Sequence, residues 1–425
     1  MNIPALIERR KRLLGPKTSM FYEDPVHIVR GEGAWLYDND GKRYLDCYNN
    51  VPSVGHCHPA VVDALCEQAR TLNTHTRYLH ENILQYAERL LAKFDDSLNR
   101  AMFVCTGSEA NDQALRIARM HTGKRGIICS NATYHGNTEA VVKLSTIFGP
   151  DDNASDDIRM VNWPDSYRTI EGLTGDDRYD AYAKQVTDAI ASLEKSGIGV
   201  AAMIVCPIFA NEGLPNDPQR YLQRVIPLIR EAGGLYITDE VQAGFGRTGK
   251  WWGHTDSGLT PDIVTLGKPM GAGHPLAGVV SKGELMDEFQ EREGYFNTFG
   301  GNPVSCAVGL AVLDVLEGEK LVENAAEVGA YVLQKFTELQ SRFDVIGDVR
   351  GNGLFFGMDL VSDRQEQTPD AALAKRIVNT MREKGVLMGS IGEHGNILKL
   401  RPPLCFSKEN ADMLVETLNE VFSAG

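Results

Sequence analysis

From about residue 100 onward, short β-rich runs alternate with helical stretches, and this alternation is the feature that most constrains the fold. The predicted strands are residues 101–105, 126–130, 200–206, 234–238, 262–266 and 276–280. Helical patterns lie between them at 109–121 and 221–233, and Pro227 inside the second pattern predicts a kink or a split. Strands that alternate with helices form a largely parallel sheet covered by those helices, so the predicted fold class is α/β.

A different pattern begins near residue 310. The amphipathic stretch "AVLDVLEGEKLVENAAEVGAYVLQKFTEL" precedes short strands and a closing helix, which indicates a smaller α+β lobe. A chain of 425 residues also exceeds the size at which single hydrophobic cores usually stop growing. We therefore expect a large domain over residues 61–310, a small domain over 311–425, and an N-terminal segment, 1–60, that belongs to the small lobe. The polar segment 151–180 is expected to be a surface excursion.

Composition excludes several classes of function. The formal net charge of −14 argues against a nucleic-acid-binding face, because such faces are normally basic. No apolar run approaches the roughly 20 residues of a membrane span, and the start, "MNIPALIERRKRLLG", lacks the apolar core of a signal peptide. We therefore expect a cytoplasmic protein that binds neither nucleic acid nor membrane. His56-Cys57-His58 resembles a metal cluster, but adjacent residues on a turn rarely share one ion, so no metal site is expected.

The stretch "DEVQAGFGRTGKW", residues 239–251, contains the glycine spacings of both a dinucleotide fingerprint and a phosphate loop. The first motif needs a helix that begins inside the glycines, and the residues that follow show no helical period. The second motif needs Ser or Thr after Lys250, where this chain has Trp251. The glycines therefore predict an irregular, tightly turned loop, and the reacting groups should lie beside it.

Chemically useful side chains follow several of the predicted strands. In open parallel sheets, ligands bind beyond the carboxyl ends of the strands. Gly107 and Ser108 open a helix after the strand at 101–105, and the N–H groups and positive dipole end of a helix N-terminus bind phosphate. The strands that end near residues 130, 238 and 266 are followed by Tyr134, Asp239 and Lys268. Proline disfavours helical geometry in the residue before it, so Lys268, which precedes Pro269, is expected on a turn.

This combination of residue types matches the requirements of pyridoxal 5'-phosphate. A lysine amine forms a Schiff base with that cofactor, and a carboxylate keeps the pyridine nitrogen protonated so that the ring can act as an electron sink. A helix N-terminus holds the phosphate, and an aromatic side chain can cover the ring. Each residue alone has an ordinary structural explanation, so the prediction depends on their coincidence at one edge of the sheet.

Nearly the whole chain resembles the class III aminotransferases, the fold-type-I group that includes ornithine and 4-aminobutyrate aminotransferases. The resemblance is carried by "LYDNDGKRYLDCYNNV", "GHCHP", "TGSEAN", "YHG", "ITDEVQAGFGRTGKWW", "PDIVTLGKPMGAGHPLAGVV" and "NTFGGNPVSCAVGLAVLDVL". It implies a fold-type-I pyridoxal phosphate enzyme, with a mainly parallel central sheet in a large domain and a smaller α+β domain. It also implies a homodimer, or a higher oligomer, with active sites shared between subunits.

The resemblance also implies a role for individual residues. Lys268 would form the Schiff base and move the proton, and Asp239 would pair with the pyridine nitrogen. Gln242 would hydrogen-bond the ring 3-oxygen, and Thr298 would reach the cofactor phosphate bound in the neighbouring subunit. Gly107 and Ser108 would hold that phosphate from within the same subunit, and Tyr134 would stack on the ring.

Two departures from the family pattern bear on the reaction. Ordinary members carry an "EPVQGEGG"-like stretch whose second Glu acts as a gate against a carboxylate-binding Arg. This chain has "CPIFANEG", so Cys206 and Asn211 occupy the two Glu positions. The Arg three residues before a Pro-Pro pair is likewise replaced, because "LKLRPPL" places Lys399 there and Arg401 one residue before the pair. Recognition of an α-amino acid and its 2-oxo acid partner is therefore in doubt.

The stretches "NNVPSVGHCHP", "LNTHTRYLHENILQYAERL", "GYFNTFGGNPVSCAVGLAVLDVLE" and "ILKLRPPLCFS" look like the ethanolamine-phosphate and phosphohydroxylysine phospho-lyases. This likeness implies a lyase that eliminates phosphate or ammonia from a small aminoalkyl phosphate or phosphonate such as O-phosphoethanolamine. The alternative is an aminotransferase that passes an amino group from an amine or ω-amino acid to a 2-oxo acid such as pyruvate. The residues predicted to contact the substrate are Arg77, Lys399, Arg401, Tyr48 and Asn50, because a phosphate needs cationic donors.

Overall fold

The computed structural model describes residues 3–17, 20–146 and 155–424. Its largest sheet has seven strands in the order β4-β10-β9-β8-β7-β5-β6. Their bounds are β4 (Arg100–Val104), β5 (Gly126–Ser130), β6 (Ile158–Val161), β7 (Val200–Val205), β8 (Leu235–Asp239), β9 (Ile263–Leu266) and β10 (Ala277–Ser281). Only β10 runs antiparallel to its neighbours in this sheet. The prediction of an α/β fold with a mainly parallel central sheet is confirmed.

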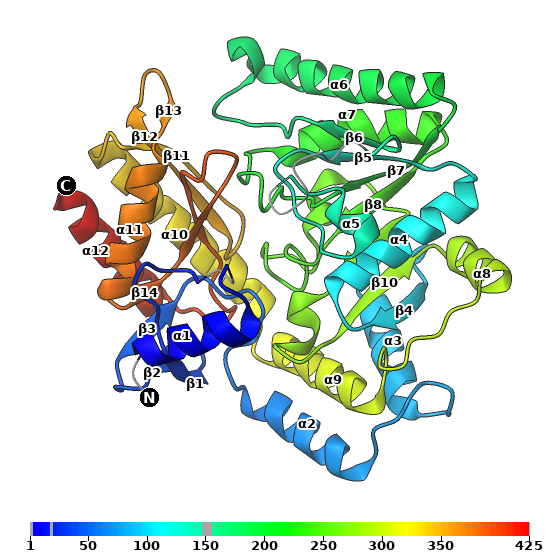
Figure 1. The fold of residues 1–425 in the computed structure, drawn as a ribbon, viewed down its shortest axis with the longest axis horizontal. Helices are drawn as coiled ribbons and strands as arrows, with labels where there is room; N and C mark the ends of the chain where they lie inside the picture. Colours follow the sequence, from blue (N-terminus) through cyan, green and yellow to red (C-terminus); the bar gives the residue numbers. More distant parts are fainter. Residues whose placement is uncertain (1–2, 18–19, 147–154, 425) are drawn as a thin grey trace.

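The helices of this part of the chain cover the sheet in Figure 1, where α6 and α7 lie along one side and α4 lies on another. They are α4 (Gly107–Thr122), α5 (Glu139–Val142), α6 (Gly175–Lys195), α7 (Pro218–Glu231) and α8 (Gly283–Arg292), with 3-10 turns η1 (Ile170–Gly172), η2 (Gly253–Ser257) and η3 (Lys268–Gly271). The helix α7 continues through Pro227, so the predicted split is wrong. The expected surface excursion at 151–180 contains β6 and the start of α6, and its residues 151–154 lie outside the described part of the chain.

The ends of the chain build two smaller sheets. One contains β1 (Ile28–Glu32), β2 (Trp35–Asp38), β3 (Arg43–Asp46) and β14 (Val386–Leu387), and the other contains β11 (Ile346–Gly351), β12 (Phe356–Asp363), β13 (Thr368–Pro369), β15 (Gly389–Ile391) and β16 (Ile397–Leu400). Because β3 pairs in parallel with β14, the N-terminal strands join the C-terminal part of the chain. The remaining helices are α1 (Ile3–Leu14), α2 (Pro59–Thr71), α3 (Glu81–Leu91), α9 (Pro303–Gly318), α10 (Leu321–Arg342), α11 (Ala371–Glu383) and α12 (Lys408–Ser423).

The amphipathic stretch after residue 310 forms two helices, because Lys320 has a left-handed backbone between α9 and α10. The predicted boundary at residue 310 falls within α9, and the boundary after residue 60 falls within α2. The predicted domain limits themselves stay predictions.

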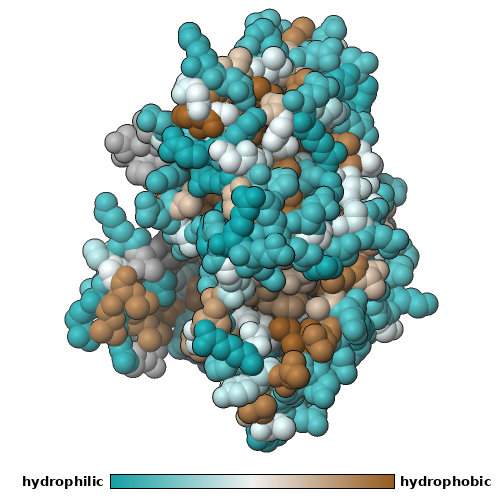
Figure 2. Space-filling model, turned by 90° about the vertical axis from the view of Figure 1, so that its right-hand side faces the viewer, coloured by the Kyte–Doolittle hydropathy of each residue, from teal (hydrophilic) through white to brown (hydrophobic). Residues whose placement is uncertain are grey.

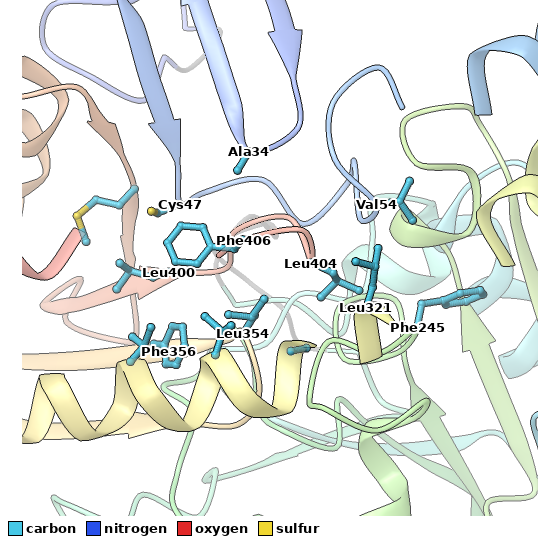
Figure 3. Packing of buried hydrophobic residues seen from close by; sticks show 14 of the residues in the cluster. Ala34, Cys47, Val54, Phe245, Leu321, Leu354, Phe356, Leu400, Leu404 and Phe406 are labelled. Carbon is cyan, nitrogen blue, oxygen red and sulfur yellow. The ribbon is translucent and has the colours of Figure 1, made fainter. Parts of the chain in front are cut away.

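One large hydrophobic cluster packs the chain ends against each other (Figure 3). Ala34, between β1 and β2, and Cys47, directly after β3, point toward Leu400 and Phe406 of the C-terminal part. Phe245, from the glycine-containing loop after β8, belongs to the same cluster. Burial of apolar surface contributes about 25 cal/mol per Å², so a shared cluster of this size holds the two lobes in a fixed relation.

A buried ion network also joins the lobes. Arg350 on β11 is fully buried, and its guanidinium lies 2.6 Å from Asp348 and 2.9 Å from Asp359. Both terminal nitrogens of Arg168, from the segment before η1, contact the two oxygens of Asp359 at 2.7 and 2.8 Å. Arg350 also donates to the carbonyl of Gly213, beyond β7. The network fixes β11 and β12 against the loops of the large sheet.

We expect Arg350→Leu to lower the free energy of unfolding by about 3 kcal/mol, because its removal leaves Asp348 without its cation and leaves the buried Asp359 with Arg168 alone. Denaturant unfolding of the holoenzyme measures this loss. The control is Arg364→Ala, which removes an exposed pair with Asp344 at 3.8 Å. An exposed pair contributes at most about 1 kcal/mol, so equal losses in both variants would contradict the assignment of a structural role to the buried network.

Candidate active site

A polar cavity of about 100 Å³ lies at the carboxyl edge of the large sheet. It is lined by Gly107, Ser108, Tyr134, His135, Gly136, Cys206, Asn211, Asp239, Val241, Gln242 and Lys268. Four of these residues, Tyr134, Asn211, Gln242 and Lys268, also line a larger cavity of about 780 Å³ that reaches the small lobe. The larger cavity adds Tyr48, Lys399 and Arg401, so these three predicted substrate residues lie beside the predicted cofactor residues of the same chain that line the small cavity.

Asp239, the last residue of β8, forms the base of the small cavity and is almost fully buried. Its Oδ2 lies 2.7 Å from Nδ1 of His135 and accepts a hydrogen bond from Asn111 at 3.0 Å, while its Oδ1 accepts one from the backbone N–H of Val241. Burial alone would raise the pKa of Asp239, but the hydrogen bond and charge of His135 bring it below the usual value. The carboxyl group is therefore held in its charged form inside the protein.

The N-terminus of α4 forms another wall of the small cavity. Thr106 and Glu109 form a capping box at this end of the helix. Gly107 and Ser108, in the first turn, line the cavity. A Cβ atom at Gly107 would lie 3.0 Å from both methyl groups of Val241, and one at Gly136, whose φ is +140°, would lie 2.5 Å from the Ser108 hydroxyl oxygen. The glycines therefore bring backbone close to Ser108, where a phosphate group can be bound.

Lys268 follows β9 and begins the short turn η3, as Pro269 predicts. It lines both cavities. Burial lowers the pKa of the Lys268 amine, the charge of Asp239 acts in the opposite direction, and the charge of Arg401 lowers the pKa further. The lysine is therefore closer to its neutral, nucleophilic form than an exposed lysine is.

Asn211, Gln242 and Lys399 form a hydrogen-bonded group between the two cavities. The amine of Lys399 donates to Oδ1 of Asn211 at 2.9 Å and to Oε1 of Gln242 at 3.3 Å. Gln242 in turn donates to Oδ1 of Asn211 at 3.1 Å, and Asn211 donates to the carbonyl of Tyr134. The residues at the family's Glu and Arg gate positions are therefore in contact, but the contact is an amide with an amine.

Lys399 and Arg401 are both buried, with exposed fractions of 2% and 8%. The Arg401 guanidinium lies over the Tyr48 ring at 4.3 Å, and its Nε has no hydrogen-bond partner among the described residues. Burial lowers the pKa of both groups, and the charge of Arg401 adds to the effect on Lys399. Among the described residues, neither Lys399 nor Arg401 has a carboxylate at salt-bridge distance, so an anion bound in the pocket would favour the charged form of Lys399 and pair with Arg401.

Three predicted residues lie outside both cavities of their own chain. Arg77 is exposed, and its guanidinium stacks over Phe296 at 3.9 Å. Thr298 is also exposed, on the loop that carries Phe296. Asn50 is buried near Tyr48 but does not line either cavity, and its Nδ2 has no partner among the described residues. The functions predicted for these three residues stay predictions.

Several residues of the site were not singled out in the sequence. His135 and Asn111, which hold Asp239, lie inside the quoted motifs "YHG" and "TGSEAN", so only the side-chain contacts show their importance. Glu212 follows Asn211 directly and is fully buried. The glycine-containing stretch after Asp239 forms consecutive turns, which confirms the predicted irregular loop.

Among the described residues, no three His, Cys, Asp or Glu side chains are grouped to hold a metal ion. None of the helices in that part of the chain is long and apolar enough to cross a membrane. The small cavity does fit pyridoxal phosphate. It offers a buried carboxylate, a half-buried lysine and a glycine-lined helix N-terminus, which are the groups that the pyridine nitrogen, the aldehyde and the phosphate of this cofactor require.

Comparison with known proteins agrees with this fit. The model of the aminotransferase class-III family matches residues 19–422, so the chain belongs to this family of pyridoxal-phosphate-dependent enzymes. A phospholyase from Arthrobacter, solved in complex with phosphoethanolamine, has a TM-score of 0.96 and 44% identity and covers 99% of this chain and 100% of its own. "Alanine--glyoxylate aminotransferase 2-like" of Drosophila melanogaster is 41% identical over 98% of this chain and 87% of its own length. "Ethanolamine-phosphate phospho-lyase homolog 1" of Caenorhabditis elegans is 38% identical, with coverages of 98% and 93%.

The depressed pKa of Lys268 can be measured in cofactor-free protein by trace acetylation over a range of pH, followed by mass spectrometry. We expect Lys268 to gain reactivity at lower pH than a free lysine side chain in the same sample, because burial disfavours its charged form. Arg401→Met should raise this pKa, and Asp239→Asn should lower it further. A Lys268 profile equal to that of free lysine, or unchanged in both variants, would contradict the electrostatic account of the pocket.

Proposed function

We propose that this protein is a pyridoxal-phosphate-dependent lyase that eliminates phosphate from a small aminoalkyl phosphate, with O-phosphoethanolamine as the representative substrate. One observation carries the proposal: Lys399 and Arg401 are buried basic side chains without a carboxylate partner among the described residues, in the cavity that also contains Lys268. Buried charges are costly unless they are paired, so such a pocket favours an anionic substrate. A phosphate dianion satisfies an ammonium and a guanidinium together.

In this proposal each residue has one task. When bound, pyridoxal phosphate withdraws electrons from the carbon that carries the substrate's amine, which makes the proton on that carbon acidic. Asp239, held charged by His135, would pair with the pyridine nitrogen, and Gln242 would hydrogen-bond the ring 3-oxygen. Gly107 and Ser108 would hold the cofactor phosphate. Tyr134 would cover the ring.

The neutral amine of Lys268 removes the proton from the amine-bearing carbon, and the lowered pKa of Lys268 favours this neutral form. The C–O bond on the adjacent carbon then breaks, and the bonding electrons leave with the phosphate. Lys399 and Arg401 stabilise the charge that grows on this leaving group. Water completes the reaction, so that O-phosphoethanolamine and water give acetaldehyde, ammonia and phosphate.

The replacement of the gate supports elimination over amino transfer. A Glu at position 211 would form an ion pair with Lys399, whereas Asn211 is a neutral partner at 2.9 Å and leaves Lys399 free to form an ion pair with a bound anion. The Arthrobacter structure is of a phospholyase in complex with phosphoethanolamine, which supports the same substrate class here.

A second candidate is an aminotransferase for an amine or ω-amino acid with pyruvate as acceptor. It is favoured by the relative from Drosophila melanogaster, whose name describes an alanine–glyoxylate aminotransferase 2-like protein and whose identity is 41%. Both reactions use the same cofactor residues, so the substrate pocket decides between them.

A homodimer is part of the proposal. Apolar side chains lie exposed between α2 and α3, in the first turn of α3 and on the loop after α8, at Leu72, Tyr78, Leu79, Leu84, Phe296 and Phe299. Figure 2 shows apolar surface gathered in the lower half of its face, at the height of α2 and α3 in Figure 1. Exposed patches of this kind mark association surfaces. Arg77 and Thr298 adjoin these residues. This position supports a dimer in which Arg77 contacts the substrate, and Thr298 the cofactor phosphate, in the active site of the partner subunit.

The test of the function is a paired assay on cofactor-loaded enzyme with O-phosphoethanolamine, which follows phosphate and ammonia with and without pyruvate. We expect both products to be released without any keto acid. If neither phosphate nor ammonia is released without pyruvate, and alanine forms when pyruvate is added, the lyase assignment is contradicted and the aminotransferase is established.

We expect Lys399→Met to raise the KM for O-phosphoethanolamine roughly ten- to a hundredfold, because a hydrogen bond to a charged group contributes about 1.5–3 kcal/mol. The matched control is Lys375→Met, which alters the same cavity at an exposed position where Lys375 pairs with Glu23 at 2.7 Å. Steady-state release of phosphate measures both variants. A KM that rises equally in both, or only in Lys375→Met, would refute the assignment of Lys399 to the phosphate subsite.

A further inference from the structure

Glu212 is a fully buried carboxyl group in the loop that follows β7. Its Oε1 accepts a hydrogen bond from the Ser130 hydroxyl at 2.6 Å, and its Oε2 accepts one from the backbone N–H of Asn211 at 3.0 Å. Burial raises the pKa of Glu212, while the hydroxyl of Ser130 and the charge of His135 oppose that rise. A carboxyl group is costly to bury, and the hydrogen bonds from Ser130 and Asn211 offset part of that cost.

The two contacts of Glu212 connect two loops of the active site. Ser130 ends β5, and the loop that begins there carries Tyr134 and His135. Asn211 lies on the other loop, and its side chain reaches the Tyr134 carbonyl and the amine of Lys399. Glu212 does not itself line either cavity.

The loop after β5 is also connected to the base of the small cavity. The Thr133 hydroxyl lies 3.2 Å from Nε2 of His135, whose Nδ1 contacts Asp239 at 2.7 Å. Hydrogen bonding from Thr133 also favours the charged form of Glu212 and so lowers its pKa. Polar contacts therefore extend from Asp239, at the cofactor end, to Lys399, at the substrate end, and Glu212 lies where the two loops meet.

We propose that Glu212 is a positioning residue that holds the Tyr134 loop and the Asn211 loop together, and thereby orients Lys399 toward the substrate phosphate. The inference deepens the proposed function, since it rests on the phosphate subsite at Lys399. If Glu212 were lost, the buried N–H of Asn211 would lack its acceptor, and the Asn211 side chain would no longer be fixed against Lys399.

The variants Glu212→Ala, Glu212→Gln and Ser130→Ala test this role. Glutamine keeps both contacts, because its carbonyl accepts from Asn211 and its amide donates to Ser130, whose hydroxyl can act as donor or acceptor. Alanine at residue 212 removes both contacts, and Ser130→Ala removes only one. Asp359→Asn is the matched control for loss of stability, because Asp359 is also a fully buried carboxyl group but belongs to the ion network between the lobes.

The readouts are the KM and kcat for phosphate release from O-phosphoethanolamine and the absorption band of the bound cofactor. We expect the cofactor band in every variant, a KM raised about tenfold or more in Glu212→Ala, a smaller rise in Ser130→Ala, and near wild-type KM in Glu212→Gln and Asp359→Asn. A KM in Glu212→Ala no higher than in Asp359→Asn would overturn the proposal. Equal defects in Glu212→Gln and Glu212→Ala would overturn it too, because charge and not position would then be decisive. If Glu212→Ala does not fold, an unchanged KM in Ser130→Ala overturns the proposal.

The dissociation constant of inorganic phosphate, measured by calorimetry on the cofactor-loaded variants, separates this inference from the proposed function. This dissociation constant should rise across the variants in the same order as KM, even if the wild-type enzyme releases no phosphate. Weakening in that order with no phosphate release would overturn the lyase and leave Glu212 as a positioning residue. Equal phosphate binding in Glu212→Ala and wild type, with normal release, would retain the lyase and overturn the role of Glu212.

Discussion

The parallel hydrogen bonding of β5, β7, β8 and β9 is the constraint on which the rest of the structure depends. It sends the carboxyl ends of these strands to one edge, where the end of β8 brings Asp239, and the segments after β5, β7 and β9 bring Tyr134, Asn211 and Lys268, to a shared cavity. A one-residue change of register in β8 would turn Asp239 to the other face of the sheet. The arrangement of the small cavity is therefore a consequence of strand pairing, and the small lobe adds Tyr48, Lys399 and Arg401 to the larger cavity.

Buried ionisable side chains have different partners between the lobes and in the pocket. Between the lobes, Arg350 meets Asp348 and Asp359 at hydrogen-bonding distance, so positive and negative groups compensate each other within the chain. In the pocket, Asp239 is compensated by His135, but Lys399 and Arg401 face neutral amides and a tyrosine ring. The first arrangement holds the structure together, and the second is completed by a ligand. This contrast is the physical reason to infer a substrate that carries an anion.

The sequence predicts the α/β class and most strand ends well, because strand periodicity and turn residues are local signals. Asp239 and Lys268 could be placed at one edge for this reason. The edge strand β6 was missed since four residues give little periodicity, and α7 passes Pro227 because the rest of its apolar face packs on the sheet. The roles of His135, Asn111 and Glu212 depend on contacts between residues far apart in the chain, which no local pattern contains. Arg77 and Thr298 lie outside the cavities of their own chain, so their predicted roles depend on a second subunit.

The most direct measurement of the central claim is a single turnover of cofactor-loaded enzyme with a slight excess of O-phosphoethanolamine and no keto acid. Rapid quenching would count phosphate released per active site while absorbance follows the cofactor. The account predicts at least one phosphate per site and a return of the cofactor to its starting spectrum, because elimination leaves the cofactor unchanged. Conversion of the cofactor to a stable aminated form without phosphate release would contradict it, since that outcome belongs to an aminotransferase.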